Sequence, residues 1–258
     1  MTRYLMTAVF LLSAATLARA EVTAEDVEYQ HDGVQLVGHL VYDPARSAKQ
    51  PAVLIVHEWW GLNDYAKRRA RQLAEMGYVA FALDMYGKGK STKEVAKAQE
   101  WSGHFRGNPL LRQRAKAGLE VLRANPHVDT RRIAAIGYCF GGTTVMELAY
   151  AGAPLAGVVS FHGSLPAPKP ADFENLAARI LVCHGADDAF VAPKKIADMQ
   201  GALNAANADW QMIYYSGAVH SFTNPDADGA GVNGVAYHAN ADRRSWQHMQ
   251  MFLTEIFK

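Results

Sequence analysis

The amino-acid sequence predicts a single-domain α/β fold, in which a mostly parallel central sheet is flanked by helices. Continuous apolar runs at 52–58 and 78–84 are typical of strands that are buried on both faces of a sheet. Segments with helical spacing separate these and later apolar runs, and that alternation favours βαβ units. The chain has 258 residues, half of them hydrophobic, which is enough for one large core.

The first twenty residues predict a secretory signal peptide rather than part of this fold. Arg3 precedes an apolar run over residues 5–17, and the Ala-Arg-Ala sequence at 18–20 is a small-residue cleavage site. The apolar run is shorter than the ~20 residues that a membrane span needs, and an uncleaved anchor is the alternative. We therefore expect an exported protein, periplasmic or secreted, whose mature domain covers residues 21–258 without stable membrane insertion.

The first half of the mature chain starts with an alternating strand and continues with helices between the two buried strands and beyond them. The alternation of apolar and polar residues at 34–43 is typical of an exposed antiparallel strand. A helix is expected over 64–76, with Asn63 or Asp64 as its N-cap and Gly77 just past its end. The same helical spacing predicts two more helices, at 91–105 and 110–124.

The second half of the chain repeats the alternation of strand and helix. Apolar segments predict strands at 132–138, 155–163, 178–185 and 210–216. Helical spacing predicts helices at 142–151, 193–205 and 240–257. The proline-rich stretch 163–173 reads as a loop between two strands, so no boundary divides the mature chain.

A cysteine framed by glycines stands where an expected strand enters an expected helix. Gly137 and Gly141 flank Cys139 in the pattern G-x-C-x-G, and glycines relieve the crowding around a strained central residue. Free N–H groups at the start of the helix favour a thiolate over a thiol. Cys139 is therefore a candidate nucleophile, although a buried structural cysteine in a packing turn would give the same pattern.

A candidate acid and a candidate base follow Cys139 in the order nucleophile, acid, base. Asp187 and Asp188 come after the expected strand at 178–185, and we choose Asp188 as the acid, with Asp187 as the alternative. His220 follows the last expected strand. The sequence thus predicts a triad in which the thiolate attacks, the imidazole transfers protons and the carboxylate orients the imidazole.

The transient oxyanion of such a reaction needs two hydrogen-bond donors. One is expected to be the backbone N–H of Phe140, the residue after the nucleophile. The other is expected from the loop after the strand at 52–56, near Trp59.

Four sequence motifs resemble those of the dienelactone hydrolase family of α/β hydrolases. They are HEWWGL from residue 57, GYCFGG from 137, HGADDAFV from 184 and HSF from 220. The resemblance extends from about residue 25 to the carboxyl terminus. It implies an α/β-hydrolase fold and a cofactor-free opening of a lactone or ester by a cysteine. It also implies that Glu58 contacts the resting cysteine and takes its proton when substrate displaces it, whereas a buried carboxylate paired with a cation is the plain alternative.

The resemblance further implies residues that bind the substrate. The family's substrates are small cyclic esters that carry a carboxylate, and cationic side chains hold that carboxylate. The matching positions here are Lys88 and Asn224, so the sequence departs from the family pattern at the second position. Aromatic side chains are expected either to wall an apolar pocket or to pack in the core, namely Trp59, Trp60, Tyr86 and Phe222.

Other classes of site and partner are less well supported. We do not expect a Cys139–Cys183 disulfide, because Cys183 falls inside the expected sheet and a bridge would remove the nucleophile. The histidines show no HExxH motif or other tight spacing, so no metal site is expected. The net charge of +1 and the lack of a basic stripe argue against a nucleic-acid partner.

The sequence therefore predicts an exported hydrolase of small esters or lactones that forms a thioester acyl-enzyme. A broader carboxylesterase or thioesterase would use the same groups, and a non-catalytic binding protein could share the scaffold. The presence of all four candidate groups, Cys139, Asp188, His220 and Glu58, argues against the binding protein. The sequence does not set the oligomeric state, although a monomer is favoured.

Overall fold

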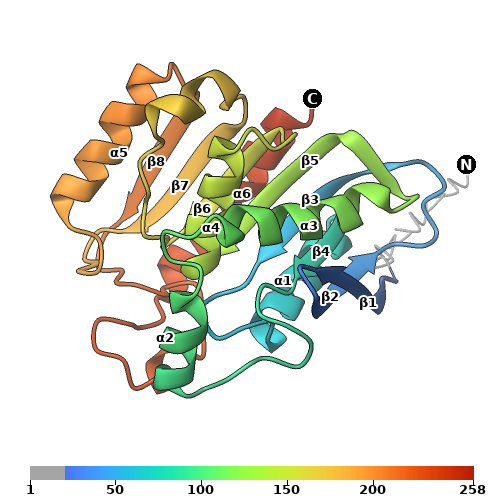
Figure 1. Cartoon of the computed structure of the whole chain (residues 1–258), viewed down its shortest axis with the longest axis horizontal. Coiled ribbons are helices and arrows are strands. Elements are labelled where there is room, and N and C mark those ends of the chain that lie inside the picture. Colours follow the sequence, from blue (N-terminus) through green and yellow to red (C-terminus); the bar gives the residue numbers. More distant parts are fainter. Residues whose placement is uncertain (1–20) are drawn as a thin grey trace, which may run out of the picture.

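The computed structural model describes residues 21–258, which form an eight-stranded sheet with helices on both faces (Figure 1). The strands are β1 (Thr23–His31), β2 (Val34–Tyr42), β3 (Gln50–Val56), β4 (Val79–Leu83), β5 (Val128–Tyr138), β6 (Gly157–Phe161), β7 (Arg179–Gly185) and β8 (Trp210–Tyr215). The helices are α1 (Asp64–Glu75), α2 (Val95–Gly103), α3 (Leu110–Ala124), α4 (Phe140–Tyr150), α5 (Pro193–Ala205) and α6 (Ala239–Ile256). Two short 3₁₀ turns, at Pro170–Asn175 and Ala227–Gly229, lie in the loops.

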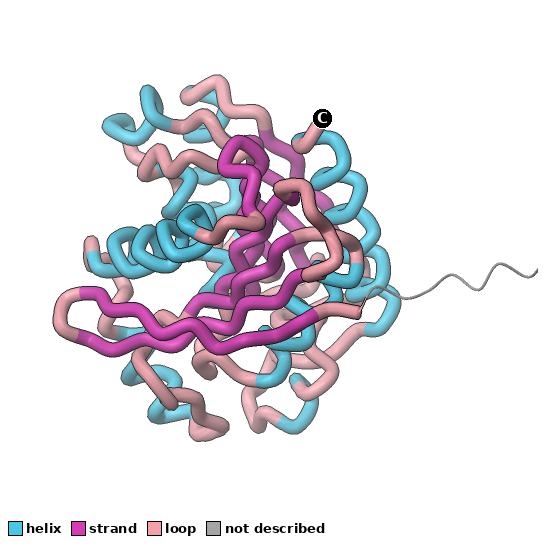
Figure 2. The backbone as a smooth tube through the Cα atoms, turned by 90° about the vertical axis from the view of Figure 1, so that its right-hand side faces the viewer, coloured by secondary structure: helices cyan, strands magenta, loops and turns pink. Residues whose placement is uncertain are grey.

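The sheet has the order β1-β2-β4-β3-β5-β6-β7-β8. β1 pairs with β2 and β2 with β4 in antiparallel fashion, and the pairs from β4 to β8 are parallel. The prediction of a mostly parallel sheet is confirmed. Figure 2 shows the twisted sheet with helices on either side.

Each face of the sheet is covered by its own set of helices, which bury separate apolar cores. α1 and α6 cover one face, where Leu73 and Leu253 pack against the sheet. α3, α4 and α5 cover the other face with side chains such as Leu119 and Met146. The central strands β3 and β4 are buried on both sides, which explains their continuous apolar sequences.

The parallel strands direct their carboxyl ends to one edge of the sheet, as an open α/β fold requires. The helix α1 starts near this edge, where the Asn63 side chain accepts a hydrogen bond from the N–H of Ala66 and caps the helix as predicted. The segment 225–238 and α2 come from distant parts of the sequence, yet they lie on the same side of the molecule (Figure 1). That side carries the candidate site.

Within residues 21–258, no helix combines the length and the apolar character that crossing a membrane requires. The signal peptide predicted for residues 1–20 lies outside the described residues.

Candidate active site

The turn between β5 and α4 holds Cys139 in the strained conformation that the glycine frame predicts. Cys139 has φ 55°, which a residue with a side chain rarely adopts. A Cβ atom on Gly137 would lie 2.0 Å from the carbonyl oxygen of Gly141. A Cβ atom on Gly141 would lie 2.1 Å from the carbonyl oxygen of Val56. Only glycine fits at either position, so the turn can form only with this frame.

The sulfur of Cys139 lies within hydrogen-bond distance of a histidine that an aspartate orients. His220 Nε2 is 3.1 Å from Cys139 Sγ, and His220 Nδ1 is 2.9 Å from Asp188 Oδ2. Asp188 is buried, and its other oxygen, Oδ1, accepts a hydrogen bond from the N–H of Phe190. The neighbouring Asp187 is exposed and does not contact His220. The structure therefore brings Asp188, and not Asp187, to the imidazole.

The electrostatic surroundings of His220 favour its protonated form. Burial acts to lower the pKa of His220, but the Cys139 sulfur and the Asp188 carboxylate act more strongly in the other direction. Together they raise the pKa of His220 to about 10. A proton on the imidazole at neutral pH is the arrangement that stabilises a thiolate partner.

Cys139 and His220 both line a cavity of about 870 Å³. Aromatic side chains from two loops and from the start of α4 form part of its wall, namely Trp59, Trp60, Phe190 and Phe140. The Phe190 side chain is 54% exposed, and its ring meets the His220 ring edge-on at 5.1 Å between centroids. The segment 225–238 is held over the cavity by a hydrogen bond from the N–H of Ala236 to the carbonyl of His220, 3.2 Å.

The two residues whose backbone N–H groups are expected to bind the oxyanion, Phe140 and Trp59, both line the cavity. Phe140 is the first residue of α4, so helix geometry leaves its N–H without an intrahelical partner. The N–H of Trp59 belongs to the same peptide group as the carbonyl of Glu58, which accepts a hydrogen bond from the N–H of Gly61 at 3.3 Å. The next peptide group is fixed as well, because Tyr86 Oη donates to the carbonyl of Trp59 at 3.1 Å. The N–H of Thr92 donates to the carbonyl of Trp60 at 2.9 Å. These bonds orient the peptide groups of the loop without any contribution from substrate.

Comparison with known proteins agrees with this architecture. A sequence model of the dienelactone hydrolase family matches residues 37–257. The chain belongs to this family. It is a dienelactone hydrolase-like hydrolase with the α/β-hydrolase fold.

Several relatives of this family member are similar over most of their length. A solved structure described as a dienelactone hydrolase-like promiscuous phosphotriesterase, from metagenomic libraries, has a TM-score of 0.89 and 39% identity, covering 92% of this chain and 99% of the other. A protein of Yersinia pestis with the provisional name carboxymethylenebutenolidase is 27% identical, over 86% of this chain and 85% of its own. An uncharacterized protein of Caenorhabditis elegans is 36% identical, over 58% of this chain and 96% of its own.

Glu58 does not make the contact with Cys139 that the family resemblance implies. Ser221 Oγ donates to Glu58 Oε1 at 3.1 Å, and Asn224 Nδ2 donates to Glu58 Oε2 at 2.6 Å. Burial raises the pKa of Glu58, although both hydrogen bonds act to lower it. The sulfur of Cys139 is thus paired with His220, while Glu58 is held by the loop that also carries His220.

Of the two positions expected to bind the substrate carboxylate, the structure corrects Lys88 and places Asn224 at the cavity. Lys88 does not line the cavity; its Nζ forms an exposed ion pair with Glu28 Oε1 at 2.6 Å. Asn224 does line the cavity, but its side-chain NH₂ group is engaged by Glu58. The spacing of motifs in the sequence could not predict these contacts, because the partners of Lys88 and Asn224 lie on segments that are far away in the sequence.

The expected aromatic residues divide between the cavity and the cores. Trp59 and Trp60 line the cavity, and their rings lie 4.8 Å apart. Tyr86 and Phe222 are buried and do not line it, so for these two the alternative of core packing is correct. Phe190 and Phe105 are aromatic wall residues that sequence reasoning missed, although Phe190 lies inside the HGADDAFV motif.

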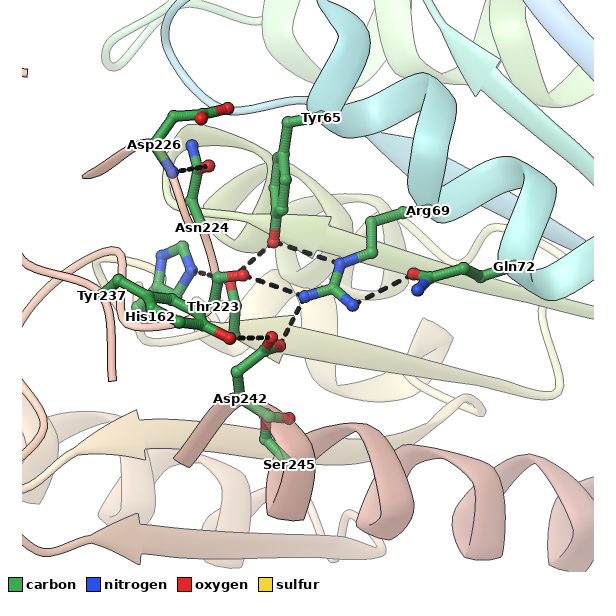
Figure 3. A network of polar contacts seen from close by, with 10 residues as sticks. All are labelled: Tyr65, Arg69, Gln72, His162, Thr223, Asn224, Asp226, Tyr237, Asp242 and Ser245. Atoms are coloured by element: carbon green, nitrogen blue, oxygen red, sulfur yellow. Dashed lines mark hydrogen bonds and ion pairs between the residues drawn. The ribbon is translucent and has the colours of Figure 1, made fainter. Parts of the chain in front are cut away.

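A buried polar network behind Cys139 was also missed by sequence reasoning (Figure 3). His162, at the end of β6, accepts a hydrogen bond from the N–H of Cys139 at 3.1 Å. On its other side, His162 Nε2 lies 2.7 Å from Thr223 Oγ1. Arg69 Nη2 donates to the carbonyl of Thr223 at 2.9 Å and is also paired with Asp242. The only signal in the sequence is the position of His162 directly after a buried strand.

The two cysteines are both free, as expected. Cys183 is fully buried in β7, and burial raises its pKa to about 12. Cys139 is partly accessible at the cavity. The two thiols therefore differ strongly in their access to a reagent.

Proposed function

We propose that this protein hydrolyses small esters or lactones by nucleophilic attack of Cys139, with His220 and Asp188 completing a triad. The observation that carries the proposal is the pair of contacts from His220, 3.1 Å to Cys139 Sγ and 2.9 Å to Asp188 Oδ2, at the wall of the cavity. Membership of the dienelactone hydrolase family supports the reaction class.

The geometry supports a two-step reaction. The Cys139 thiolate attacks the carbonyl carbon, and the N–H groups of Phe140 and Trp59 stabilise the oxyanion that forms. His220 then gives its proton to the departing oxygen, which leaves a thioester on Cys139. Neutral His220 next removes a proton from water as the water attacks the thioester. Loss of the sulfur as a thiolate restores the starting pair and releases the acid.

The cavity favours substrates without a negative charge near the reacting carbonyl. The two positions that resemblance assigns to carboxylate binding are engaged elsewhere, Lys88 by Glu28 and Asn224 by Glu58. Lys93 and Arg106 line the cavity but are exposed, so water screens their charge. We therefore propose neutral esters and lactones as the preferred substrates, and a broader carboxylesterase or thioesterase activity is the alternative.

A rate assay on residues 21–258 tests this proposal. It compares a dienelactone, which carries a carboxylate, with p-nitrophenyl acetate, which is neutral, and uses Cys139→Ala as the blank. We expect Cys139-dependent turnover with a higher kcat/KM for the neutral ester. A higher kcat/KM for the dienelactone would contradict the charge preference and retain the nucleophile. No Cys139-dependent turnover of either compound, nor of a thioester, would favour a binding protein.

A second candidate substrate class is the phosphotriesters. The similar solved structure at 39% identity is described as a promiscuous phosphotriesterase. A phosphotriester is neutral, which fits a cavity whose cations are exposed and whose wall is partly aromatic. Release of p-nitrophenol from diethyl p-nitrophenyl phosphate, measured against Cys139→Ala, tests this candidate. A rate equal to that of the variant excludes it.

We also propose that the protein is exported and that residues 1–20 are removed. The basic start, the apolar run and the Ala-Arg-Ala sequence support this proposal. Amino-terminal sequencing of the protein after expression with its own first twenty residues is expected to read from Glu21. Retention of Met1 in the periplasmic or membrane fraction would instead indicate an uncleaved anchor.

A further inference from the structure

The cysteine and histidine of the proposed site come from segments that are 81 residues apart in sequence. Cys139 lies on the turn between β5 and α4, and His220 lies on the loop that follows β8. Nothing in the local sequence of either segment sets the distance between sulfur and imidazole. Two hydrogen bonds connect these segments: the N–H of Cys139 donates to His162 Nδ1, and His162 Nε2 lies 2.7 Å from Thr223 Oγ1, a contact drawn in Figure 3.

We propose that His162 and Thr223 are positioning residues, whose mutual hydrogen bond ties the turn carrying Cys139 to the loop carrying His220 and thereby keeps the sulfur and the imidazole in contact. This inference rests on the proposed function, because the hydrogen bond between His162 and Thr223 has a role in catalysis only if Cys139 and His220 act together in the reaction.

The hydrogen bonds of His162 define which ring nitrogen carries its proton. The N–H of Cys139 is shared between the carbonyl of Phe161 at 3.0 Å and His162 Nδ1 at 3.1 Å. An N–H can only donate, so His162 Nδ1 must accept. The single proton of the neutral ring is then on Nε2, which donates to Thr223 Oγ1 at 2.7 Å. Burial lowers the pKa of His162 well below its usual value, so the ring stays neutral. The ring therefore links Cys139 to Thr223 with one hydrogen bond on each side.

Thr223 is held firmly enough to transmit this link to the base. It is buried and lies three residues after His220. Its hydroxyl also contacts Tyr65 Oη at 2.7 Å, and its carbonyl accepts from Arg69 Nη2 at 2.9 Å. The rings of His162 and His220 are in edge-to-face contact at 5.3 Å between centroids. A shift of Thr223 would thus move the part of the loop that carries His220, the proposed base.

The test measures the reactivity of the Cys139 sulfur toward iodoacetamide and needs no substrate. The thiolate is the reacting form, and its stability depends on contact with the His220 imidazolium. Cys183 is buried, and the Cys139→Ala variant gives the background. Failure of the esterase proposal would appear as absent turnover in the rate assay, which leaves the alkylation measurement unaffected.

Three variants of the link are compared with one control at the far end of the network. Thr223→Val removes the hydroxyl but keeps a side chain of similar shape, and Thr223→Ser keeps the hydroxyl. Gln72→Ala removes only the contact at 3.1 Å between Gln72 Oε1 and Arg69 Nη1. His162→Phe replaces Thr223→Val if that variant does not fold, because it keeps a ring and loses both hydrogen bonds.

We expect the alkylation rate of Thr223→Val at pH 7 to fall by about tenfold, because the sulfur loses its fixed contact with the His220 imidazolium. Thr223→Ser should restore most of the rate, and Gln72→Ala should match the wild type. A purely structural role of Thr223 would lower thermal stability without a change in the alkylation rate of the folded protein, and that result overturns the proposal. Equal losses in Thr223→Val and Thr223→Ser also overturn it, because the hydroxyl would then not be the cause.

Discussion

At the scale of single residues, Asn224 shows that one side chain that departs from the family pattern changes the polar contacts around it. The family resemblance identified position 224 as a departure, and the structure shows that its NH₂ group donates to Glu58 at 2.6 Å. The sequence correctly indicated Cys139, His220 and Asp188 as residues that come together, because their order along the chain follows the strand ends. It could not indicate the partners of Lys88 or Asn224, since these lie on other loops.

The contacts of Asn224 predict the outcome of a charge introduced there. The guanidinium of Asn224→Arg would meet Glu58, whose pKa burial raises, and would pair with that carboxylate rather than with substrate. We expect the ratio of kcat/KM for dienelactone over p-nitrophenyl acetate to change by less than about twofold, or ~0.4 kcal/mol. Lys88→Gln should leave both rates unchanged, because Lys88 is exposed outside the cavity. A large gain for dienelactone in Asn224→Arg would show that the new cation reaches substrate.

The pKa of His220 predicts how the rate depends on pH. The Cys139 sulfur and Asp188 raise this pKa to about 10, and the protonated imidazole is the form that protonates the departing oxygen. The rate should therefore persist at neutral pH and fall as pH rises through about 10. Asp188→Asn removes a carboxylate that raises the pKa, so the fall should occur at lower pH, by about one pH unit for each ~1.4 kcal/mol lost.

The adjacent aspartate is a matched control for this pH profile. Asp187 is exposed and does not contact His220. Asp187→Asn should keep the wild-type profile of kcat/KM against pH. If both variants shifted the profile equally, a general change in charge at the loop, and not the hydrogen bond from His220 to Asp188, would be responsible.

At the scale of secondary-structure elements, the hydrophobic periodicity of the sequence predicted the positions of helices better than it predicted the strand at the edge of the sheet. The expected helices at 110–124 and 193–205 coincide with α3 and α5, because each has clear apolar spacing and a proline near its start. The strand β1 was missed because most of its side chains are exposed and Glu25, Asp26 and Glu28 interrupt its apolar residues. The pair Asp32-Gly33 marks the hairpin between β1 and β2, and both residues have positive φ. That pair was the signal that could have predicted β1.

The turn before α4 predicts a large cost for a single methyl group. In Gly141→Ala, the new Cβ would start 2.1 Å from the carbonyl oxygen of Val56, and neither backbone segment can move without disturbing the sheet. We expect a loss of more than ~4 kcal/mol in the free energy of unfolding, in the range that marks a specific clash. Urea unfolding followed by fluorescence measures this loss.

A glycine elsewhere in a helix provides the control for that substitution. Gly201 lies in α5, and nothing lies within 4 Å of the position that a Cβ would take. Gly201→Ala should stabilise the protein by about 0.5–1 kcal/mol, because alanine loses less backbone entropy in a helix. Similar effects of the two substitutions would mean that the turn at Cys139 can relax, contrary to the packing around it.

At the scale of the whole molecule, the layered α/β arrangement was predictable, and the polar contacts between helices far apart in the sequence were not. Apolar runs and helical spacing are local properties of the sequence, so they predict a sheet covered on both faces. Arg69 in α1 and Asp242 in α6 are 173 residues apart, and they meet only because both helices cover the same face. The Arg69 guanidinium also lies 4.9 Å from the ring of Trp246. This buried cation joins the two helices to the loop that contains Thr223.

The burial of Arg69 predicts that removing one member of this ion pair costs far more than removing an exposed one. Arg69→Leu leaves the Thr223 carbonyl without its donor and leaves Asp242 with a hydrogen bond from Tyr237 Oη but no cation. We therefore expect a loss of about 3–5 kcal/mol in the free energy of unfolding. Lys97→Ala breaks an exposed pair with Glu94 and should cost less than about 1 kcal/mol. Urea unfolding of both variants gives the two values.

The double variant Arg69→Leu/Asp242→Leu separates the ion pair from the other contacts of the guanidinium. It removes the unpaired carboxylate but still leaves the Thr223 carbonyl without a donor. We expect it to recover part of the stability lost in Arg69→Leu. Its sulfur should react with iodoacetamide more slowly than wild type, because the loop that carries His220 has lost a hydrogen bond at Thr223. A double variant with full stability and wild-type sulfur reactivity would show that the pair is replaceable and that the hydroxyl link between His162 and Thr223 positions the loop without it.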